Sequence, residues 1–315
     1  MPGSIQQLLV QDAARLAVML GLDSGTARIE VQILLRHVLK VSRASLLAHP
    51  ERCLTDQEQA RYHELLLRRL RGEPLAYLLG EREFFGLIFK VTPATLIPRP
   101  ETELLVELAL RHVPQMHPAP QASDRTTSHS TRRQSRQVAG YPACAGGSLF
   151  RVLDLGTGCG AIALSIAHAR PDAEVVAVEA SAAALVVAHE NAHQLNIANI
   201  VFEPGNWFEP LDMQRFDLIV SNPPYVAAGD PHLLQGDLPF EPLSALASGV
   251  DGLEDIRRIV SNAPAHLNPG GWLMFEHGYD QAVTVRNLLR EAGLLEVFSV
   301  RDLAGIERVS GGRFA

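Results

Sequence analysis

Asp154-Leu155-Gly156-Thr157-Gly158-Cys159-Gly160 separates a short apolar run at 152–155 from a helical pattern at 161–169. Three alternate glycines let the backbone turn tightly and approach a ligand with no Cβ in the way. Such a turn at the carboxyl edge of a parallel sheet is typical of small-molecule binding, and a tight connection without a ligand is the alternative. The spacing differs from G-x-G-x-x-G and lacks the Lys-Ser/Thr pair of a P-loop, and the Asp154 carboxylate would repel a phosphate. The stretch therefore favours a cationic or amine-bearing ligand.

The strand-then-helix rhythm that starts here continues to the end of the chain. We expect strands at 152–155, 174–178, 200–202, 216–221 and 272–275, helices at 161–169, 182–195, 253–266 and 281–292, and a closing antiparallel pair at 295–301 and 307–314. Alternation of this kind predicts an α/β fold, in which helices cover both faces of a doubly wound, mostly parallel sheet. The expected strands would make this sheet seven-stranded.

The first part of the chain, 1–75, has a different pattern. Its apolar residues recur at three- and four-residue spacing, which predicts a small all-helical bundle. Within it, Thr55 and Glu58 form a capping-box pattern in front of a helix expected at 56–71.

A linker and an insertion interrupt the chain after the bundle. We expect 76–100 to be a β-hairpin linker, because 83–91 is aromatic and β-branched around a glycine. The α/β domain would then span 101–315 and begin with a helix at 101–112. The segment 114–148 is rich in Pro, Ser, Thr, Gln and Gly and nearly empty of large apolar residues. Burial cannot offset the entropy of ordering such a segment, so we expect a disordered insertion.

The composition is that of a globular chain, with 28 Lys+Arg against 35 Asp+Glu, a formal charge of −7 and 47% apolar residues. No apolar run of about 18 residues predicts a membrane span, and the amino end lacks the pattern of a secretory signal. Cys53, Cys144 and Cys159 are too far apart for a C-x-x-C pair, which suits a reducing compartment. We expect a cytoplasmic protein with no membrane partner. The acidic balance disfavours direct nucleic acid binding, and no spacing indicates a metal site.

Two further elements follow the next expected strands. Glu179 ends the second strand, where an acid can accept both hydroxyls of a ribose, and a surface glutamate is the alternative. Gly205-Asn206-Trp207-Phe208 follows the third strand. There a polar side chain can meet an adenine edge and an aromatic ring can cover its face, although a Trp taken singly, such as Trp207, is more often a core residue. With the glycine turn, these residues predict a pocket for a nucleoside that carries a positive charge.

Ser221-Asn222-Pro223-Pro224-Tyr225 follows the strand expected at 216–221 and so lies at the same sheet edge. Two adjacent prolines lack backbone N–H donors and have a fixed φ, which leaves rigid carbonyls that only accept hydrogen bonds. The side-chain carbonyl of Asn222 beside the Pro223 carbonyl makes a pair of acceptors suited to a planar NH2 group. The Tyr225 ring can pack on the plane of that group. In isolation, a turn without a chemical role is the alternative.

The glycine turn and Asn222–Tyr225 together resemble the S-adenosylmethionine-dependent methyltransferases that modify planar nitrogens. Four more segments and the helical amino domain extend the resemblance to the bacterial release factor glutamine methyltransferase family: Pro98-Arg99-Pro100-Glu101-Thr102-Glu103, Gly205-Asn206-Trp207-Phe208, Phe240-Glu241-Pro242-Leu243-Ser244-Ala245-Leu246 and Glu276-His277-Gly278. The resemblance covers nearly the whole chain except the insertion at 114–148. Three positions depart from the family pattern, because Glu179 and Asn206 each stand where Asp is more common and Cys159 stands where Thr is more common.

The resemblance implies N5-methylation of the glutamine in the Gly-Gly-Gln motif of class I peptide chain release factors. S-adenosyl-L-methionine would be the donor, S-adenosyl-L-homocysteine the product, and no metal would take part. The residues implied to bind the cofactor are Gly156, Thr157, Gly158, Cys159, Gly160, Glu179, Trp207 and Asn222. The residues implied to bind the substrate are Asn222, Pro223, Pro224 and Tyr225, of which Asn222 and Pro223 would be catalytic. The helical domain would hold the body of the release factor.

Three other functions remain open at this point. Glutamine methylation of a ribosomal protein would use the same pair of acceptors, and only the amino domain and the partner-facing surface would differ. Adenine-N6 methylation of DNA or RNA would also act on a planar amino group, but the net charge of −7 disfavours it. A cofactor-binding regulator without catalysis would leave the Asn-Pro-Pro-Tyr segment without a role.

Overall fold

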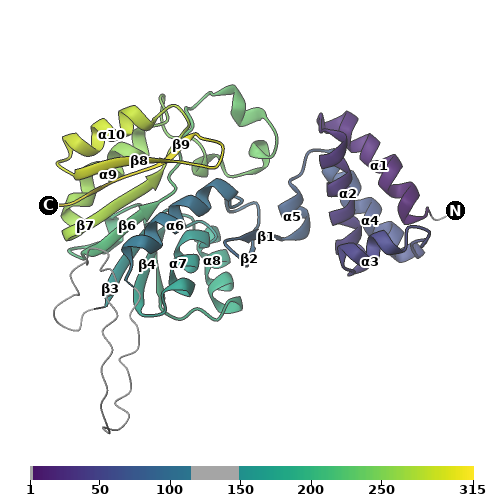
Figure 1. Ribbon diagram of the computed structural model, residues 1–315, viewed down its shortest axis with the longest axis horizontal. Helices are drawn as coiled ribbons and strands as arrows, with labels where there is room; N and C mark the ends of the chain where they lie inside the picture. The colour runs from purple at the N-terminus through teal and green to yellow at the C-terminus, as the bar shows by residue number, and fades with distance from the viewer. Residues whose placement is uncertain (1–2, 115–148) are drawn as a thin grey trace, which may run out of the picture.

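The computed structural model describes residues 3–114 and 149–315. The insertion expected at 114–148 lies, apart from Pro114, outside these residues. The amino-terminal helices form one body and the sheet domain another, with a short helix and a hairpin between them (Figure 1). In the described part of the chain, every helix is too short or too polar to cross a membrane.

The helices of the amino-terminal body are α1 (Ile5–Leu20), α2 (Ser24–Leu39), α3 (Arg43–Ala48) and α4 (Asp56–Leu70). Polar side chains cap two of them in the same way. Ser4 and Gln7 form a capping box before α1, and Thr55 and Glu58 form the predicted box before α4. Each box satisfies backbone N–H groups that have no partner within the helix. The apolar sides of the helices enclose a core of their own, which contains the buried ring of Tyr62.

The segment between the two bodies consists of a short helix and a hairpin: α5 (Leu75–Leu79), β1 (Glu81–Phe84) and β2 (Leu87–Lys90). The hairpin was predicted, whereas the sequence pattern did not indicate α5. Leu78 of α5 packs into the bundle core, while Ala76 and Tyr77 belong to the core of the sheet domain. Phe84 and Phe89 of the hairpin lie in that second core as well. The hairpin is therefore packed as part of the sheet domain.

The sheet domain opens with a 3-10 turn at Pro100–Thr102 and α6 (Glu103–His112), and continues with β3 (Phe150–Leu155), α7 (Ala161–Ala169), β4 (Ala173–Glu179), α8 (Ala182–Gln194), β5 (Ile200–Pro204), β6 (Phe216–Ser221), α9 (Glu254–His266), β7 (Leu267–Glu276), α10 (Ala282–Glu291), β8 (Leu295–Arg301) and β9 (Glu307–Arg313). The strand order is β5-β4-β3-β6-β7-β9-β8. The pairs from β5 to β7 are parallel, and β9 is antiparallel to both of its neighbours. The α/β class and the mostly parallel, seven-stranded sheet are thus confirmed.

Helices cover both faces of this sheet (Figure 1). Val152 of β3 lies in the core formed with α6 and α7, whereas Leu153, the next residue, lies in the core formed with α9 and α10. Both side chains are fully buried, because successive residues of a central strand point to opposite, covered faces. The strand order reverses direction between β3 and β6. The loops that follow β4, β3 and β6 therefore meet at one crevice, where open α/β sheets bind ligands.

Candidate active site

A cavity of about 280 Å³ opens at the carboxyl ends of these strands. Its lining residues are Ala94, Thr95, Leu96, Gly156, Gly158, Val178, Glu179, Ala180, Ser181, Ala184, Gly205, Asn206, Trp207, Asn222, Pro224, Pro242, Ser244, Ala245 and Asp255. Of the predicted site residues, the cavity brings together Gly156, Gly158, Glu179, Trp207 and Asn222, and Pro224 joins them. Thr157, Cys159, Gly160, Pro223 and Tyr225 do not line it.

The glycines of the turn after β3 have different neighbours. All three have positive φ values, +72° at Gly156, +58° at Gly158 and +86° at Gly160, where side chains are strained. A Cβ on Gly158 would meet nothing within 4 Å, so this part of the turn is open to the cavity. A Cβ on Gly156 would lie 3.3 Å from the Trp207 ring, and one on Gly160 would lie 2.8 Å from Leu164 Cδ1. Gly160 is therefore required for packing against α7.

The side chains of Thr157 and Cys159 are buried beneath the turn. Thr157 Oγ1 donates to Asp154 Oδ2 at 2.7 Å. Burial raises the pKa of the Asp154 carboxyl to about 7, and its Oδ1 has no hydrogen-bond partner among the described residues. Cys159 lies in the apolar core, where burial raises the pKa of its thiol to about 12. These side chains shape the turn from below.

Glu179 ends β4 and reaches across to the turn. Its Oε2 accepts the Gly158 N–H at 2.9 Å, and its Oε1 accepts the Ser181 N–H at 2.8 Å. These two hydrogen bonds fix the Glu179 carboxylate in place. Each carboxylate oxygen has a second lone-pair direction, so it can still accept a further hydrogen bond. This geometry suits the pair of hydroxyls on a ribose.

Trp207 follows β5 with a φ of +55°, in the left-handed region. A bulky residue rarely adopts this conformation, and such strain persists only where the surroundings fix it. Here the ring packs against the core on the α9 side and lies over Gly156. Asn206 lines the cavity beside it. The strained turn thus places an aromatic ring and an amide at the same wall.

Asn222 begins the segment after β6 and lines the cavity. Its Nδ2 donates to Thr102 Oγ1 at 3.2 Å, and Thr102 Oγ1 donates to Glu276 Oε2 at 2.6 Å. Tyr225 is turned to the α9 side of the sheet, and its hydroxyl donates to Glu276 Oε1 at 3.1 Å. Burial raises the pKa values of both Glu276 and Tyr225, while the hydrogen bonds that Glu276 accepts act in the opposite direction on its carboxyl.

Several cavity residues were not among the predicted site residues. Thr95 and Leu96 come from the segment after the hairpin, Ser244 from the loop before α9, and Asp255 from the first turn of α9. The segment 240–246 carried the family resemblance, but nothing in its local pattern assigned it to the cavity. Only the packing of distant segments shows that they contribute.

Arg99 belongs to one of the segments that carry the family resemblance, and a contact with a ligand and a structural ion pair are both open to a cation at this position. Its Nη2 lies 2.6 Å from Glu241 Oε2, and Glu241 Oε1 also accepts the Ile97 N–H at 3.3 Å. Arg99 does not line the cavity. The structure thus supports the ion pair, which ties the segment after the hairpin to the loop before α9.

The charges of the lining indicate the kind of ligand. Among the described residues it contains two carboxylates, Glu179 and Asp255, and no Lys or Arg. A phosphate would therefore meet repulsion without a compensating cation. An open glycine turn, a fixed carboxylate, an aromatic wall and an acidic lining fit a nucleoside that carries a positive charge. The site lies on a seven-stranded sheet in which β9 runs antiparallel to its neighbours. This site and this sheet together define an α/β domain of the methyltransferase class.

The comparisons with known proteins agree with this class. A protein-family model described as the PrmC N-terminal domain matches residues 13–80, and a family model described as the methyltransferase small domain matches residues 147–235. The catalytic domain of hMettl16 has the same fold, with a TM-score of 0.53 at 15% identity, covering 83% of this chain and 82% of that chain.

Two relatives are similar over almost their whole length. The release factor glutamine methyltransferase of Bordetella pertussis is 50% identical, covering 92% of this chain and 96% of the relative. The release factor glutamine methyltransferase of Xylella fastidiosa (strain Temecula1) is 47% identical, covering 91% of this chain and 93% of the relative. The chain belongs to the release factor glutamine methyltransferase family.

Proposed function

We propose that this enzyme transfers a methyl group from S-adenosyl-L-methionine to N5 of the glutamine in the Gly-Gly-Gln motif of class I peptide chain release factors. S-adenosyl-L-homocysteine would be the second product. Family membership supports the substrate, because two relatives named release factor glutamine methyltransferase match more than 90% of the chain. The observation that carries the chemistry is the Asn222 carboxamide, which lines the cavity while its Nδ2 is bound to Thr102.

The predicted site residues divide into a cofactor side and a substrate side in this proposal. The backbone at Gly156 and Gly158 would leave room for the methionyl part of the cofactor, Glu179 would accept the ribose hydroxyls, and Trp207 would lie beside the adenine. Thr157, Cys159 and Gly160 act indirectly, by holding the turn in shape. Asn222, Pro223, Pro224 and Tyr225 form the substrate side. When bound, the cofactor supplies a methyl group on a sulfonium leaving group.

The chain's own part in the chemistry is to orient a weak nucleophile. The lone pair of an amide nitrogen is delocalised into the carbonyl, so binding alone does not make it reactive. Asn222 Oδ1 and the Pro223 carbonyl would accept the two N–H groups of the glutamine, which aligns the nitrogen and lets it pyramidalise. These acceptors bind more strongly as positive charge develops on the nitrogen, and so they stabilise the transition state selectively.

No dedicated base and no metal are needed in this scheme. A methylated amide that still carries its extra proton is strongly acidic, so the proton can pass to water. The sulfonium already provides a good leaving group, so no Lewis acid is required. From the scattered cysteines and the formal charge of −7, we propose a cytoplasmic enzyme that needs no nucleic acid or membrane partner. From family membership, we propose that its helical domain holds the release factor body.

The experiment that tests the function locates the added methyl group. The enzyme is incubated with isotope-labelled cofactor and an unmodified class I release factor, and the product is mapped by mass spectrometry. We expect one methyl group on the Gly-Gly-Gln glutamine, and none when that glutamine is replaced by alanine. Labelling of a ribosomal protein, or of adenine in nucleic acid, in place of the release factor would contradict the proposal and identify the corresponding alternative.

A further inference from the structure

Thr102 occupies the N-cap position of α6 without capping the helix. Thr is favoured at this position because its hydroxyl normally accepts a backbone N–H of the first turn. The Thr102 side chain makes no such bond. Its hydroxyl is directed instead to Glu276 and Asn222, and the residue is only 4% exposed. A residue suited to capping is therefore used for a contact between distant segments.

Glu276 determines the direction of these hydrogen bonds. A hydroxyl carries one proton, and that of Thr102 is donated to Glu276 Oε2 at 2.6 Å. The Thr102 oxygen then has only lone pairs left, so it can accept Nδ2–H of Asn222 but cannot donate to Oδ1. The carboxamide of Asn222 is nearly symmetric in shape, and this bond distinguishes its two ends. Nδ2 is therefore the amide atom that Thr102 binds, and Oδ1 is the amide atom that Thr102 does not bind.

The sheet explains why these residues meet. β6 and β7 are parallel with Ser221 opposite Phe275, so Asn222, directly after β6, lies at the same level as Glu276, the last residue of β7. Phe275 lies in the core formed with α9 and α10. Glu276 faces the opposite side, where α6 starts. The two contacts to Thr102 span 120 and 174 residues of sequence, so they depend entirely on the tertiary fold.

We propose that Thr102, with its hydroxyl proton held by Glu276, is the positioning residue that presents Asn222 Oδ1 to the substrate amide. The inference rests on the proposed glutamine methylation and adds the residues that orient its acceptor. A flipped Asn222 would offer Nδ2–H groups to the N–H groups of the glutamine, and donor would face donor. Without the Thr102 hydroxyl, nothing in this contact distinguishes the two orientations.

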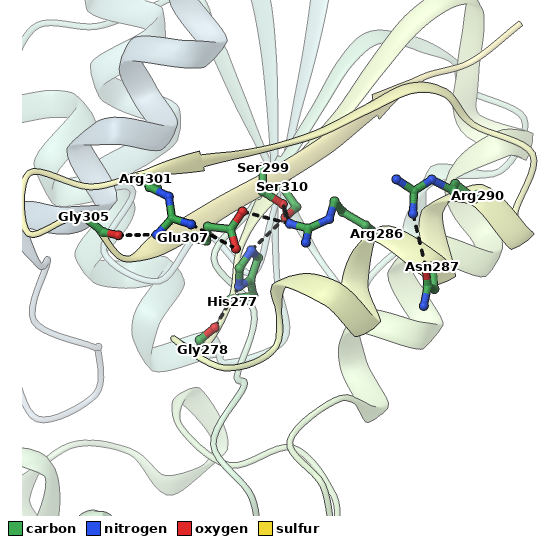
Figure 2. Close-up of polar contacts among 10 residues, drawn as sticks. All are labelled: His277, Gly278, Arg286, Asn287, Arg290, Ser299, Arg301, Gly305, Glu307 and Ser310. Carbon is green, nitrogen blue, oxygen red and sulfur yellow. Dashed lines mark hydrogen bonds and ion pairs between the residues drawn. The ribbon is translucent and has the colours of Figure 1, made fainter.

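A second polar network beside Glu276 provides a matched control. His277 Nε2 contacts Ser310 Oγ at 2.8 Å, Ser310 contacts Ser299 at 2.7 Å, and Arg286 donates to Ser299 at 2.6 Å (Figure 2). At its other end, His277 Nδ1 donates to the Gly278 carbonyl. These bonds stabilise β8, β9 and α10, and none of them reaches Asn222–Tyr225. Ser310→Ala therefore disturbs buried polar packing next to Glu276 without touching Thr102 or Asn222.

The test compares Thr102→Val, which keeps the shape but removes the hydroxyl, with Thr102→Ser, which keeps the hydroxyl. We expect Thr102→Val to lower kcat by about 10- to 100-fold and Thr102→Ser by less than about threefold. The KM for release factor and the Kd for cofactor should stay within about threefold in both variants. Glu276→Met removes, at similar volume, the acceptor for both the Thr102 proton and the Tyr225 hydroxyl, so it should lower kcat at least as much as Thr102→Val. Ser310→Ala should lower the midpoint of thermal unfolding but leave kcat within about threefold.

A double-mutant cycle separates positioning from general damage. If Thr102 acts through Asn222, Thr102→Val should change kcat by less than about twofold in an Asn222→Ala background. The same fold-loss in both backgrounds would overturn the inference, and so would a Thr102→Val variant as active as the wild type. If Glu276→Met does not fold, the Thr102 variants alone decide the result.

A second readout does not depend on activity. The side-chain NH2 resonances of Asn222 are identified in an ¹⁵N-labelled sample by their loss in Asn222→Ala, and their exchange with water is measured. We expect slow exchange of one proton in the wild type and in Thr102→Ser, and fast exchange in Thr102→Val. Equally fast exchange in the wild type would overturn the inference even if the release factor is methylated. Slow exchange without methylation of a release factor would contradict the proposed function and leave the positioning contact intact.

Discussion

Asn191 Nδ2 donates to the Cys159 carbonyl at 2.8 Å and so ties α8 to the glycine turn. The same side chain binds the hairpin, because its Oδ1 accepts the Lys90 N–H at 2.7 Å and its Nδ2 donates to the Lys90 carbonyl at 3.0 Å. Asn191 is fully buried. One amide therefore holds both the turn that lines the cavity and the hairpin beside it.

Replacing Asn191 should affect both stability and the cavity. Asn191→Ala leaves three backbone groups without their partner, and we expect the free energy of unfolding to fall by about 2–4 kcal/mol. Asn199 is a matched control, because its Nδ2 also contacts three backbone groups, the carbonyls of Ala167, Arg170 and Ala173. Urea unfolding should show a loss for both variants. Calorimetry should show weaker cofactor binding only for Asn191→Ala, and equal cofactor affinity in the two variants would contradict this role.

The glycines of the turn should respond differently to a methyl group. At Gly160 an added Cβ would clash with Leu164 at 2.8 Å in addition to the strain of a positive φ. Gly160→Ala should therefore lower the free energy of unfolding by at least about 2 kcal/mol. At Gly158 the same strain applies, but no atom lies within 4 Å. Gly158→Ala should keep more stability yet weaken cofactor binding by about tenfold or more, because the methyl enters the cavity. If Gly158→Ala is the less stable variant and Gly160→Ala the weaker in cofactor binding, the roles given to these two glycines are wrong.

The buried carboxyl of Asp154 should make stability depend on pH. Burial raises its pKa in the folded state to about 7, from the ordinary value of 3.8. The folded state therefore binds the proton more tightly than the unfolded state. The contribution of protonated Asp154 to the free energy of unfolding is fully present below the pKa that this carboxyl has in the unfolded state. It is lost as the pH rises through about 7.

Asp154→Asn isolates this contribution, because it cannot titrate and can still accept the Thr157 hydroxyl. The free energies of unfolding of both proteins are measured by urea titration at pH 5 and at pH 8. The wild type should lose stability relative to the variant between these values. If the free energies of unfolding of the wild type and the variant differ by the same amount at both pH values, Asp154 does not titrate in this range.

Asn222→Ala should separate turnover from binding. The proposed acceptor acts mainly in the transition state, so its removal should lower the single-turnover rate by about 100- to 1,000-fold. The Kd for cofactor should change by less than about threefold, because the turn, Glu179 and Trp207 remain. Rapid-quench measurements with labelled cofactor give the rate, and calorimetry gives the affinity. An unchanged rate would remove Asn222 from the chemistry.

The sequence was informative wherever a short pattern fixes a local conformation. The box at Thr55 and Glu58 defined the start of α4, and short apolar runs that alternate with helical patterns predicted central strands such as β3. The same reasoning placed the glycine turn and Asn222 at the carboxyl ends of their strands. It could not show that α5 forms, because five residues between two cores carry no periodic signal.

What the sequence by itself determined is most of the helices and strands, the α/β class and the chemistry available at the ends of β3, β4, β5 and β6, because these follow from local periodicity and side-chain type. The tertiary structure alone decided which residues of the glycine turn face the cavity, since Gly156 and Gly158 line it while the side chains of Thr157 and Cys159 are buried beneath the turn. It also decided that the hydroxyl of Thr102 leaves its own helix and meets Asn222 and Glu276. That contact depends on the register between β6 and β7 and on where α6 starts above them, which no stretch of neighbouring residues encodes.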